Sequence, residues 1–210
     1  MRTRIKICGI TRTEDAVAAA AAGADAIGLV FYAPSARAIS PDAARGISAA
    51  MPAFVARVGV FLNAKAAFVR KVLTDVPLDV LQFHGEEPPD VCESFGRPYI
   101  KAIAMGGEAD IAHYMARYPG ACGFLLDSHL PGQAGGSGTV VNWAQVPLRS
   151  GRSLILAGGL NVDNVALAMR SARPYGVDIS SGVERAKGIK DVGKIAAFIN
   201  EVKRVDSQQE

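Results

Sequence analysis

Eight short apolar runs alternate with helical patterns along this 210-residue chain, and the alternation constrains the fold more than any other feature. The runs are Arg4 to Cys8, Ala26 to Phe31, Ala56 to Leu62, Leu78 to Phe83, Tyr99 to Ala104, Gly123 to Leu126, Ser153 to Ala157 and Gly176 to Ile179. Strands that alternate with helices run parallel, and buried parallel strands are apolar throughout. The pattern therefore predicts an α/β fold, a closed (β/α)8 TIM barrel, with an open doubly wound sheet as the alternative.

The length and composition predict a single domain, a barrel over residues 1–210. Half of the residues are hydrophobic, and no Gly/Ser-rich or Pro-rich linker interrupts the pattern. The chain is near the lower size limit of such barrels, roughly 200 residues, so we expect short helices. The segment from Leu130 to Val141 is too rich in glycine for a normal helix, and Trp143 to Val146 leaves room for little more than a turn.

Several helix starts can be predicted from capping residues, whose side chains accept hydrogen bonds from the first helical N–H groups. The predicted caps are Thr11 with Glu14 as a capping box, Ser40 before Pro41, Asn63, and Asn161.

Charge and cysteine content exclude several function classes. The net charge of +3 comes without a basic cluster interleaved with aromatics, so we expect no nucleic-acid partner, whereas a small anionic ligand is compatible. No apolar run approaches the roughly 18 residues of a membrane span, and no signal peptide is apparent. The widely spaced Cys8, Cys92 and Cys122 indicate a reducing cytoplasm without disulfides or zinc, and the three distant histidines give no metal site.

Cys8 lies at the end of the first apolar run, in the segment Lys6-Ile7-Cys8-Gly9-Ile10-Thr11 just before a helix. In α/β sheets that position is at the carboxyl ends of the strands, where ligands bind. Asp127, after the sixth run, is either a capping group or a catalytic carboxyl. An acid facing a thiol across a barrel mouth would suit proton transfers on two sides of one small substrate. The alternative for Cys8 is an inert buried thiol.

Glycines and serines follow the last two runs, where barrels commonly bind phosphate through backbone N–H groups. Gly158 and Gly159 follow the seventh run, and Ser181 and Gly182 follow the eighth. Each pair alone could be an ordinary turn, but the two together predict a phosphate site. Because the chain has neither a Gly-x-Gly-x-x-Gly motif after its first strand nor a Walker lysine, the ligand is predicted to be a sugar phosphate.

Four further residues have predicted places near this site. Lys6 shares a strand face with Cys8 and could favour its thiolate, with Asp178 as ion-pair partner and further candidate for substrate binding. A simple buried ion pair is the alternative. Arg37 is a loop guanidinium able to bind a carboxylate or a phosphate bidentately. His84 is predicted to be structural or positioning, since nothing nearby in the sequence orients it.

With these residues the chain resembles the phosphoribosylanthranilate isomerase family of tryptophan biosynthesis. The similarity covers nearly the whole chain and includes Lys6 to Thr11, Phe31 to Ser40, Val58 to Phe61, Leu81 to Glu86, Leu126-Asp127-Ser128, Gly135 to Gly138, Leu156 to Asn161 and Asp178 to Glu184. Two departures are Phe83, which we expect to pack toward the helices, and Ala186-Lys187-Gly188 in place of a Pro-Gly sequence.

The resemblance implies an Amadori rearrangement of N-(5′-phosphoribosyl)anthranilate to 1-(2-carboxyphenylamino)-1-deoxyribulose 5-phosphate, without cofactor or metal. It implies Asp127 as general acid, Cys8 as general base, Arg37 at the anthranilate carboxylate, and the backbones of Gly159, Ser181 and Gly182 at the phosphate. The expected partner is this small-molecule substrate, and the protein is expected to be a monomer or a homodimer. Another phosphate-binding barrel enzyme and a non-catalytic sugar-phosphate-binding barrel are the alternatives.

Overall fold

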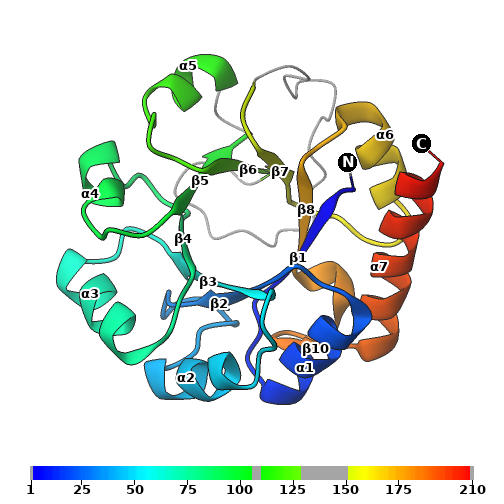
Figure 1. Cartoon of the computed structure of the whole chain (residues 1–210), viewed down its shortest axis with the longest axis horizontal. Helices are drawn as coiled ribbons and strands as arrows, with labels where there is room; N and C mark the ends of the chain where they lie inside the picture. The colour runs from blue at the N-terminus through cyan, green and yellow to red at the C-terminus, as the bar shows by residue number, and fades with distance from the viewer. Residues whose placement is uncertain (1, 106–109, 129–150, 209–210) are drawn as a thin grey trace.

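Eight parallel strands close into a barrel in chain order in the computed structural model, which describes residues 2–105, 110–128 and 151–208 (Figure 1). The strands are β1 (Arg4–Cys8), β2 (Ala26–Val30), β3 (Ala56–Phe61), β4 (Val80–Phe83), β5 (Tyr99–Ala104), β6 (Gly123–Asp127), β7 (Leu154–Leu156) and β8 (Gly176–Ile179). Strand β1 pairs with β8 and thereby closes the barrel, and Lys6 is in register with Asp178 in this pair. The predicted (β/α)8 barrel is confirmed.

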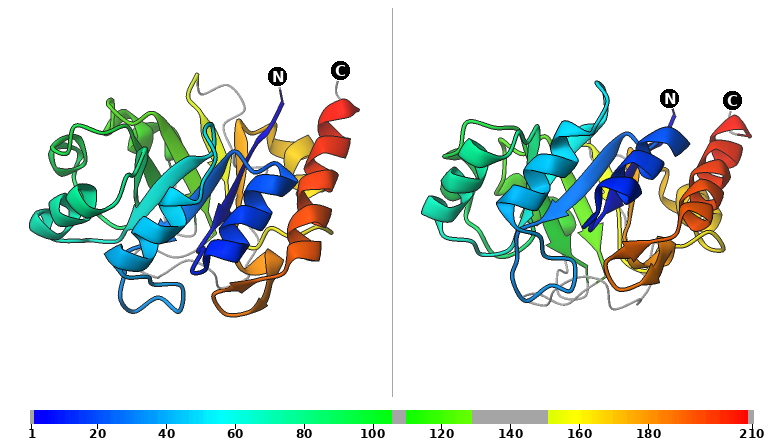
Figure 2. Two further views of the ribbon diagram at one scale, coloured as in Figure 1. Left: turned by 60° about the horizontal axis from the view of Figure 1, so that its bottom comes forward. Right: turned by 90° about the horizontal axis from the view of Figure 1, so that it is seen from below.

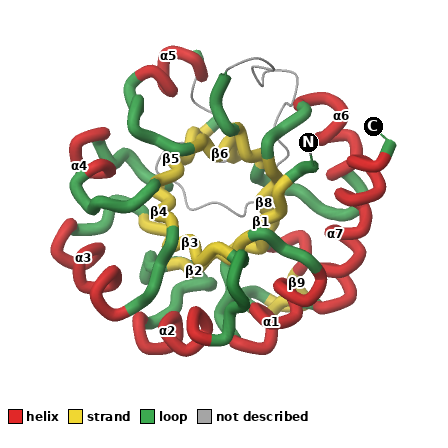
Figure 3. The backbone as a smooth tube through the Cα atoms, viewed as in Figure 1, coloured by secondary structure: helices red, strands yellow, loops and turns green. Residues whose placement is uncertain are grey.

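Helices surround the strands as an outer ring (Figure 3). They are α1 (Thr13–Ala22), α2 (Pro41–Ala49), α3 (Ala66–Asp75), α4 (Pro89–Glu93), α5 (Ile111–Ala116), α6 (Val165–Ala172) and α7 (Val192–Ser207). In the described ranges no helix has the length and apolar character needed to cross a membrane. The predictions for 130–141 and 143–146 lie outside the described residues.

After β8 the chain forms a 3-10 turn, η2 (Ser181–Val183), and a small antiparallel hairpin of β9 (Glu184–Ala186) and β10 (Ile189–Lys190), before α7. The sequence analysis did not predict this hairpin. Both views of Figure 2 place the hairpin and the loop after β2 at the same end of the barrel, opposite the two chain termini. This end is the one where the strands have their carboxyl termini.

One of the predicted helix starts, at Ser40, agrees with the structure, and a second, at Asn161, lies three residues before the residue that precedes its helix, Asn164. The Ser40 side chain accepts a hydrogen bond from the N–H of Ala43, with Pro41 as the first residue of α2. Asn161 Oδ1 accepts from the N–H groups of Asp163 and Asn164 at 2.9 and 3.1 Å, so it caps the turn that leads into α6, which itself begins at Val165.

The other two predicted caps are wrong, because tertiary contacts use the polar side chains instead. Helix α1 begins at Thr13 after Arg12, and the Thr11 hydroxyl donates to the carbonyl of Gly188 in the β9–β10 hairpin. Asn63 adopts a left-handed φ of 49°, and its Oδ1 accepts from the N–H of Glu86 at 2.7 Å, whereas α3 begins at Ala66.

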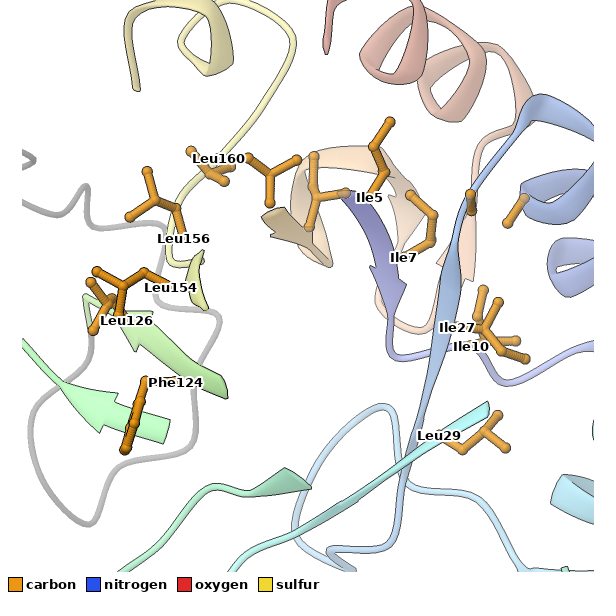
Figure 4. Packing of buried hydrophobic residues seen from close by; sticks show 14 of the residues in the cluster. Ile5, Ile7, Ile10, Ile27, Leu29, Phe124, Leu126, Leu154, Leu156 and Leu160 are labelled. Carbon is orange, nitrogen blue, oxygen red and sulfur yellow. The ribbon is translucent and has the colours of Figure 1, made fainter. Parts of the chain in front are cut away.

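The main apolar core lies between the strands and the helices. Alternation along β1 turns Ile5 and Ile7 outward into this layer (Figure 4) and leaves Lys6 and Cys8 on the inner face. Burying each of those isoleucine side chains contributes roughly 1.5 to 3 kcal/mol to the free energy of folding. Phe83 also faces outward, with its ring centroid 5.8 Å from that of Phe95, so the predicted packing toward the helices is confirmed.

Candidate active site

A pocket opens at the carboxyl ends of the strands, and most of the predicted site residues line it. Those in its lining are Cys8, Arg37, Asp127, Gly158, Gly159, Asp178 and Ser181. Gly182 is not in the lining. A Cβ atom at Gly182 would lie 2.1 Å from the carbonyl oxygen of Leu160. The absence of a side chain at this position therefore lets the segments after β7 and β8 pack together. The eight predicted residues are thus brought to one end of the barrel.

The Cys8 thiol occupies a space that glycine provides on the neighbouring strand. A Cβ atom at Gly28 of β2 would lie 2.6 Å from Cys8 Sγ. The predicted ion pair is present, with Lys6 Nζ 2.7 Å from Asp178 Oδ2 and both side chains buried. Burial raises the pKa of Cys8 above its ordinary value, Lys6 opposes this shift, and Asp178 adds to it. The thiol is therefore held in its neutral form at neutral pH.

Asp127 faces His84, a contact that the sequence analysis missed. His84 Nε2 is 3.5 Å from Asp127 Oδ2 at the end of β6, and Gln82 Nε2 is 3.1 Å from His84 Nδ1. If the Gln82 amide donates to Nδ1, the neutral ring carries its proton on Nε2, toward Asp127. The expectation that nothing orients His84 is therefore wrong. Gln82 and His84 share one strand face, and that alternation was the available signal.

The segments after β7 and β8 present bare backbone to the pocket. Gly158 and Gly159 have φ values of 77° and 67°, a region that favours glycine. A Cβ atom at Gly158 would also lie 2.3 Å from Ser128 Oγ, so close approach to the segment after β6 excludes a side chain. Ser181 begins η2, with only Ser180 between it and the end of β8. Bare backbone therefore lies where the sequence predicts an anion site, and binding of an anion there stays a prediction.

Arg37 reaches the pocket from the loop after β2, but its guanidinium already has a protein partner. Nε and Nη2 of Arg37 donate to the two carboxylate oxygens of Glu184 at 2.7 and 2.8 Å. Lys190 Nζ lies 2.9 Å from the same carboxylate. Neither Glu184 nor Lys190 was singled out from the sequence, because nothing local in it joins them to Arg37.

The described ranges 2–105, 110–128 and 151–208 contain no candidate metal site. There no group of three or more His, Cys, Asp or Glu side chains is arranged to hold a metal ion. The chemistry that the pocket offers instead is a carboxyl group, a thiol and a guanidinium around one small space. Fold and site together define a (β/α)8 barrel with an acid, a thiol and a guanidinium around one pocket at the carboxyl ends of its strands.

Comparison with known proteins specifies the family. The family model described as N-(5'phosphoribosyl)anthranilate (PRA) isomerase matches residues 5–201. The N-(5'-phosphoribosyl)anthranilate isomerase of Pseudomonas putida is 54% identical over 201 residues, covering 96% of this chain and 98% of that protein. The chain therefore belongs to the N-(5'-phosphoribosyl)anthranilate isomerase family and is an isomerase of tryptophan biosynthesis. The resemblance and the enzyme class predicted from the sequence are confirmed.

Solved structures agree with this assignment. Phosphoribosyl anthranilate isomerase from Thermotoga maritima superposes with a TM-score of 0.87 at 42% identity, covering 96% of this chain and 99% of that one. A phosphoribosyl anthranilate isomerase in complex with reduced 1-(o-carboxyphenylamino)-1-deoxyribulose 5-phosphate gives a TM-score of 0.85 at 40% identity, covering 96% and 99%.

Proposed function

We propose that the chain carries out the rearrangement of N-(5′-phosphoribosyl)anthranilate with Asp127 as general acid and Cys8 as general base. The observation that carries this assignment is that both side chains line one pocket together with Arg37 and the backbone segments after β7 and β8. A proton donor and a proton acceptor are thereby available to one bound substrate. The whole chain acts as one catalytic domain without cofactor or metal.

Asp127 begins the reaction by protonating the ring oxygen of the ribose, so that the C1′–O bond breaks and an iminium ion forms. The Asp127 side chain is only 8% exposed at the end of β6 and lies in the lining of the pocket, where it can reach a bound sugar. Once it has given up that proton, the resulting carboxylate faces the Nε2 side of His84. A donor there stabilises the carboxylate.

Cys8 then removes the proton from C2′ of the iminium ion to give an enolamine, which tautomerises to the ketone product. The thiolate is the form that accepts a proton, and burial of the side chain disfavours it. The positive iminium, together with Lys6, stabilises the thiolate while the substrate is bound. As the intermediate forms, Cys8 releases its own proton to solvent. The C2′ proton then restores the thiol, and a proton from solvent restores the carboxylic acid of Asp127, so that no net proton is gained or lost.

The remaining contacts fix the orientation of the substrate. The phosphate binds to the backbone of Gly158 and Gly159 and of Ser181 and Gly182, and the anthranilate carboxylate binds to Arg37. Asp178 Oδ1 is buried in the pocket wall and has no hydrogen-bond donor in the part of the chain that the structure describes. A sugar hydroxyl of the substrate supplies that donor, because a buried carboxylate oxygen without a partner is costly.

The test is turnover of N-(5′-phosphoribosyl)anthranilate by the purified protein, followed by the loss of its fluorescence and by chromatographic identification of the product. We expect formation of 1-(2-carboxyphenylamino)-1-deoxyribulose 5-phosphate without added metal and in the presence of a chelator. Binding of the substrate without turnover would instead indicate a sugar-phosphate-binding barrel. In the cell the site of action is the cytoplasm, and the working unit is a monomer or a homodimer.

A further inference from the structure

Two charged residues of the β9–β10 hairpin, Glu184 and Lys190, are buried beside the pocket and have no part in the steps above. They are in register across the hairpin, and their side chains are 6% and 0% exposed. At the hairpin turn, a Cβ atom at Gly188 would lie 3.0 Å from the carbonyl oxygen of Ala36. The hairpin therefore packs directly on the loop that carries Arg37.

Glu184 occupies one of the two binding edges of the Arg37 guanidinium. A guanidinium can bind one carboxylate through Nε and Nη2 and a second through Nη1 and Nη2. Glu184 uses the first edge, at 2.7 and 2.8 Å. The aliphatic stem of Arg37 is confined as well, since a Cβ atom at Gly9 would lie 2.5 Å from its Cδ. One edge and the stem are thus fixed, and the second edge is the one left for a ligand.

The charges in this cluster leave an excess of one positive charge. Burial alone would raise the pKa of Glu184, but hydrogen bonds from Arg37 and Lys190 outweigh burial and hold that pKa below its usual range. Glu184 is therefore a carboxylate shared between Arg37 and Lys190. Burial lowers the pKa of Lys190, and the contact with Glu184 opposes that shift and favours the ammonium form. The nearby Asp15 accepts a hydrogen bond from the Lys190 backbone, but its own charge is paired with Arg12. A ligand carboxylate at Arg37 would bring the cluster to neutrality.

Lys190 also reaches the other end of the pocket. Its Nζ donates to the backbone carbonyl of Ser180 at 3.0 Å, in addition to its contact with Glu184 at 2.9 Å. Ser180 is the residue between β8 and the Ser181–Gly182 backbone that we assign to the phosphate. The ammonium group of Lys190 therefore contacts both Glu184, which binds Arg37, and Ser180, where the proposed phosphate-binding segment begins.

We propose that Glu184 and Lys190 are positioning residues that set the spacing between the carboxylate end and the phosphate end of the site. Glu184 directs the free edge of Arg37 toward an aromatic carboxylate. Lys190 balances the negative charge of Glu184, so that the positive charge of Arg37 remains available to the ligand. Lys190 also holds the segment after β8 through its hydrogen bond to Ser180. This inference rests on the proposed function, because it takes the ligand to carry a carboxylate and a phosphate.

The test compares two ligands by calorimetric titration. One is reduced 1-(o-carboxyphenylamino)-1-deoxyribulose 5-phosphate, and the other is the same molecule without its carboxyl group. Glu184→Gln adds one positive charge to the cluster, which by itself would raise the preference for the carboxylated ligand. If Glu184 orients Arg37, the preference should instead fall by at least about tenfold, the factor corresponding to a charge-assisted hydrogen bond. The substitution should change affinity for the carboxyl-free ligand far less. A preference that survives Glu184→Gln would overturn the proposal.

Lys190 is tested with the same pair of ligands. Lys190→Met should weaken both of them, because it disturbs both ends of the pocket, whereas Lys190→Arg should restore much of the affinity. Weaker binding of only one of the two ligands would contradict the proposal that Lys190 connects the carboxylate end and the phosphate end of the pocket. Asp79→Asn is the matched control, since Asp79 binds Arg57 through two hydrogen bonds of 2.7 Å at the opposite end of the strands. It should leave both affinities unchanged.

If Glu184→Gln does not fold, a second variant, Arg37→Lys, tests the same proposal. Arg37→Lys keeps the charge but has no second edge, so it cannot bind Glu184 and the ligand carboxylate bidentately at once. We expect it to lose the preference for the carboxylated ligand, and retention would overturn the proposal. Equal affinity of the two ligands for the unmodified protein would instead contradict the assignment of Arg37 in the proposed function, and this inference would fail with it.

Discussion

At the scale of single residues, the charges inside the barrel determine which form of the Cys8 thiol is present. Lys6 lowers the pKa of Cys8 and Asp178 raises it, while burial raises it more than either partner changes it. The sequence was sufficient to predict Cys8, Asp127 and the Lys6–Asp178 pair, because alternation along a strand determines which side chains share a face. It could not predict that Glu184 would bind Arg37, since one lies in a hairpin outside the barrel and the other in a loop, where strand alternation gives no guide.

The electrostatics of Cys8 predict opposite effects for two substitutions. Lys6→Met removes the cation that favours the thiolate, so the rise of kcat/KM with pH should move to higher pH. Asp178→Asn removes the anion that disfavours the thiolate and leaves Lys6 uncompensated, so the rise should move to lower pH. The measurement is kcat/KM against pH for the two variants and the unmodified protein. Shifts in the same direction would contradict the role of these charges.

At the scale of elements, strands were easier to predict than helix starts. Each of the eight predicted runs overlaps one observed strand, because burial on both sides makes a parallel strand apolar throughout, and only β6 extends beyond its run, by Asp127. Thr11 and Asn63 were assigned to helix caps, but both are bound by residues distant in the chain. Local capping rules cannot include such partners. The β9–β10 hairpin was missed for a similar reason, since two short strands outside the barrel give little periodicity.

The turns after β7 and β8 predict where an anion binds. In crystals grown with sulfate or phosphate, the anion should be held mainly by the backbone N–H groups of Gly159, Ser181 and Gly182, with side-chain cations secondary. Gly158→Ala should weaken inorganic phosphate binding, because a Cβ there would lie 2.3 Å from Ser128 Oγ. An anion elsewhere in the barrel mouth, with this position empty at high sulfate, would contradict the assignment.

At the scale of the whole molecule, closure of the barrel makes the ends of the chain depend on each other. β1 pairs with β8, and α7 packs against both α1 and α6. Buried charges also join neighbouring segments of the barrel: Lys101 of β5 lies 3.2 Å from Glu87, which also accepts from the N–H of Asn63 after β3. The sequence predicted one domain, and this connectivity gives the physical reason to expect one cooperative unit.

Removal of Glu87 tests that expectation. Glu87→Ala leaves the fully buried Lys101 without its carboxylate, which should reduce the free energy of unfolding by about 3 to 5 kcal/mol. Urea unfolding followed by circular dichroism and by fluorescence should give coincident transitions in both proteins. Arg45→Ala, which removes an exposed ion pair with Asp42, is the control and should have little effect. Two separate transitions in the unmodified protein would contradict a single domain.

The central claim is that Asp127 and Cys8 perform the two proton transfers, and turnover by variants of these residues tests it most directly. Asp127→Asn and Cys8→Ala should each lower kcat by at least about 100-fold, the range for loss of a general acid or base, with product affinity nearly unchanged. Cys92→Ala, at a buried thiol in the outer core, is the matched control and should keep near-normal kcat. Near-normal turnover by either Asp127→Asn or Cys8→Ala would remove that residue from the mechanism.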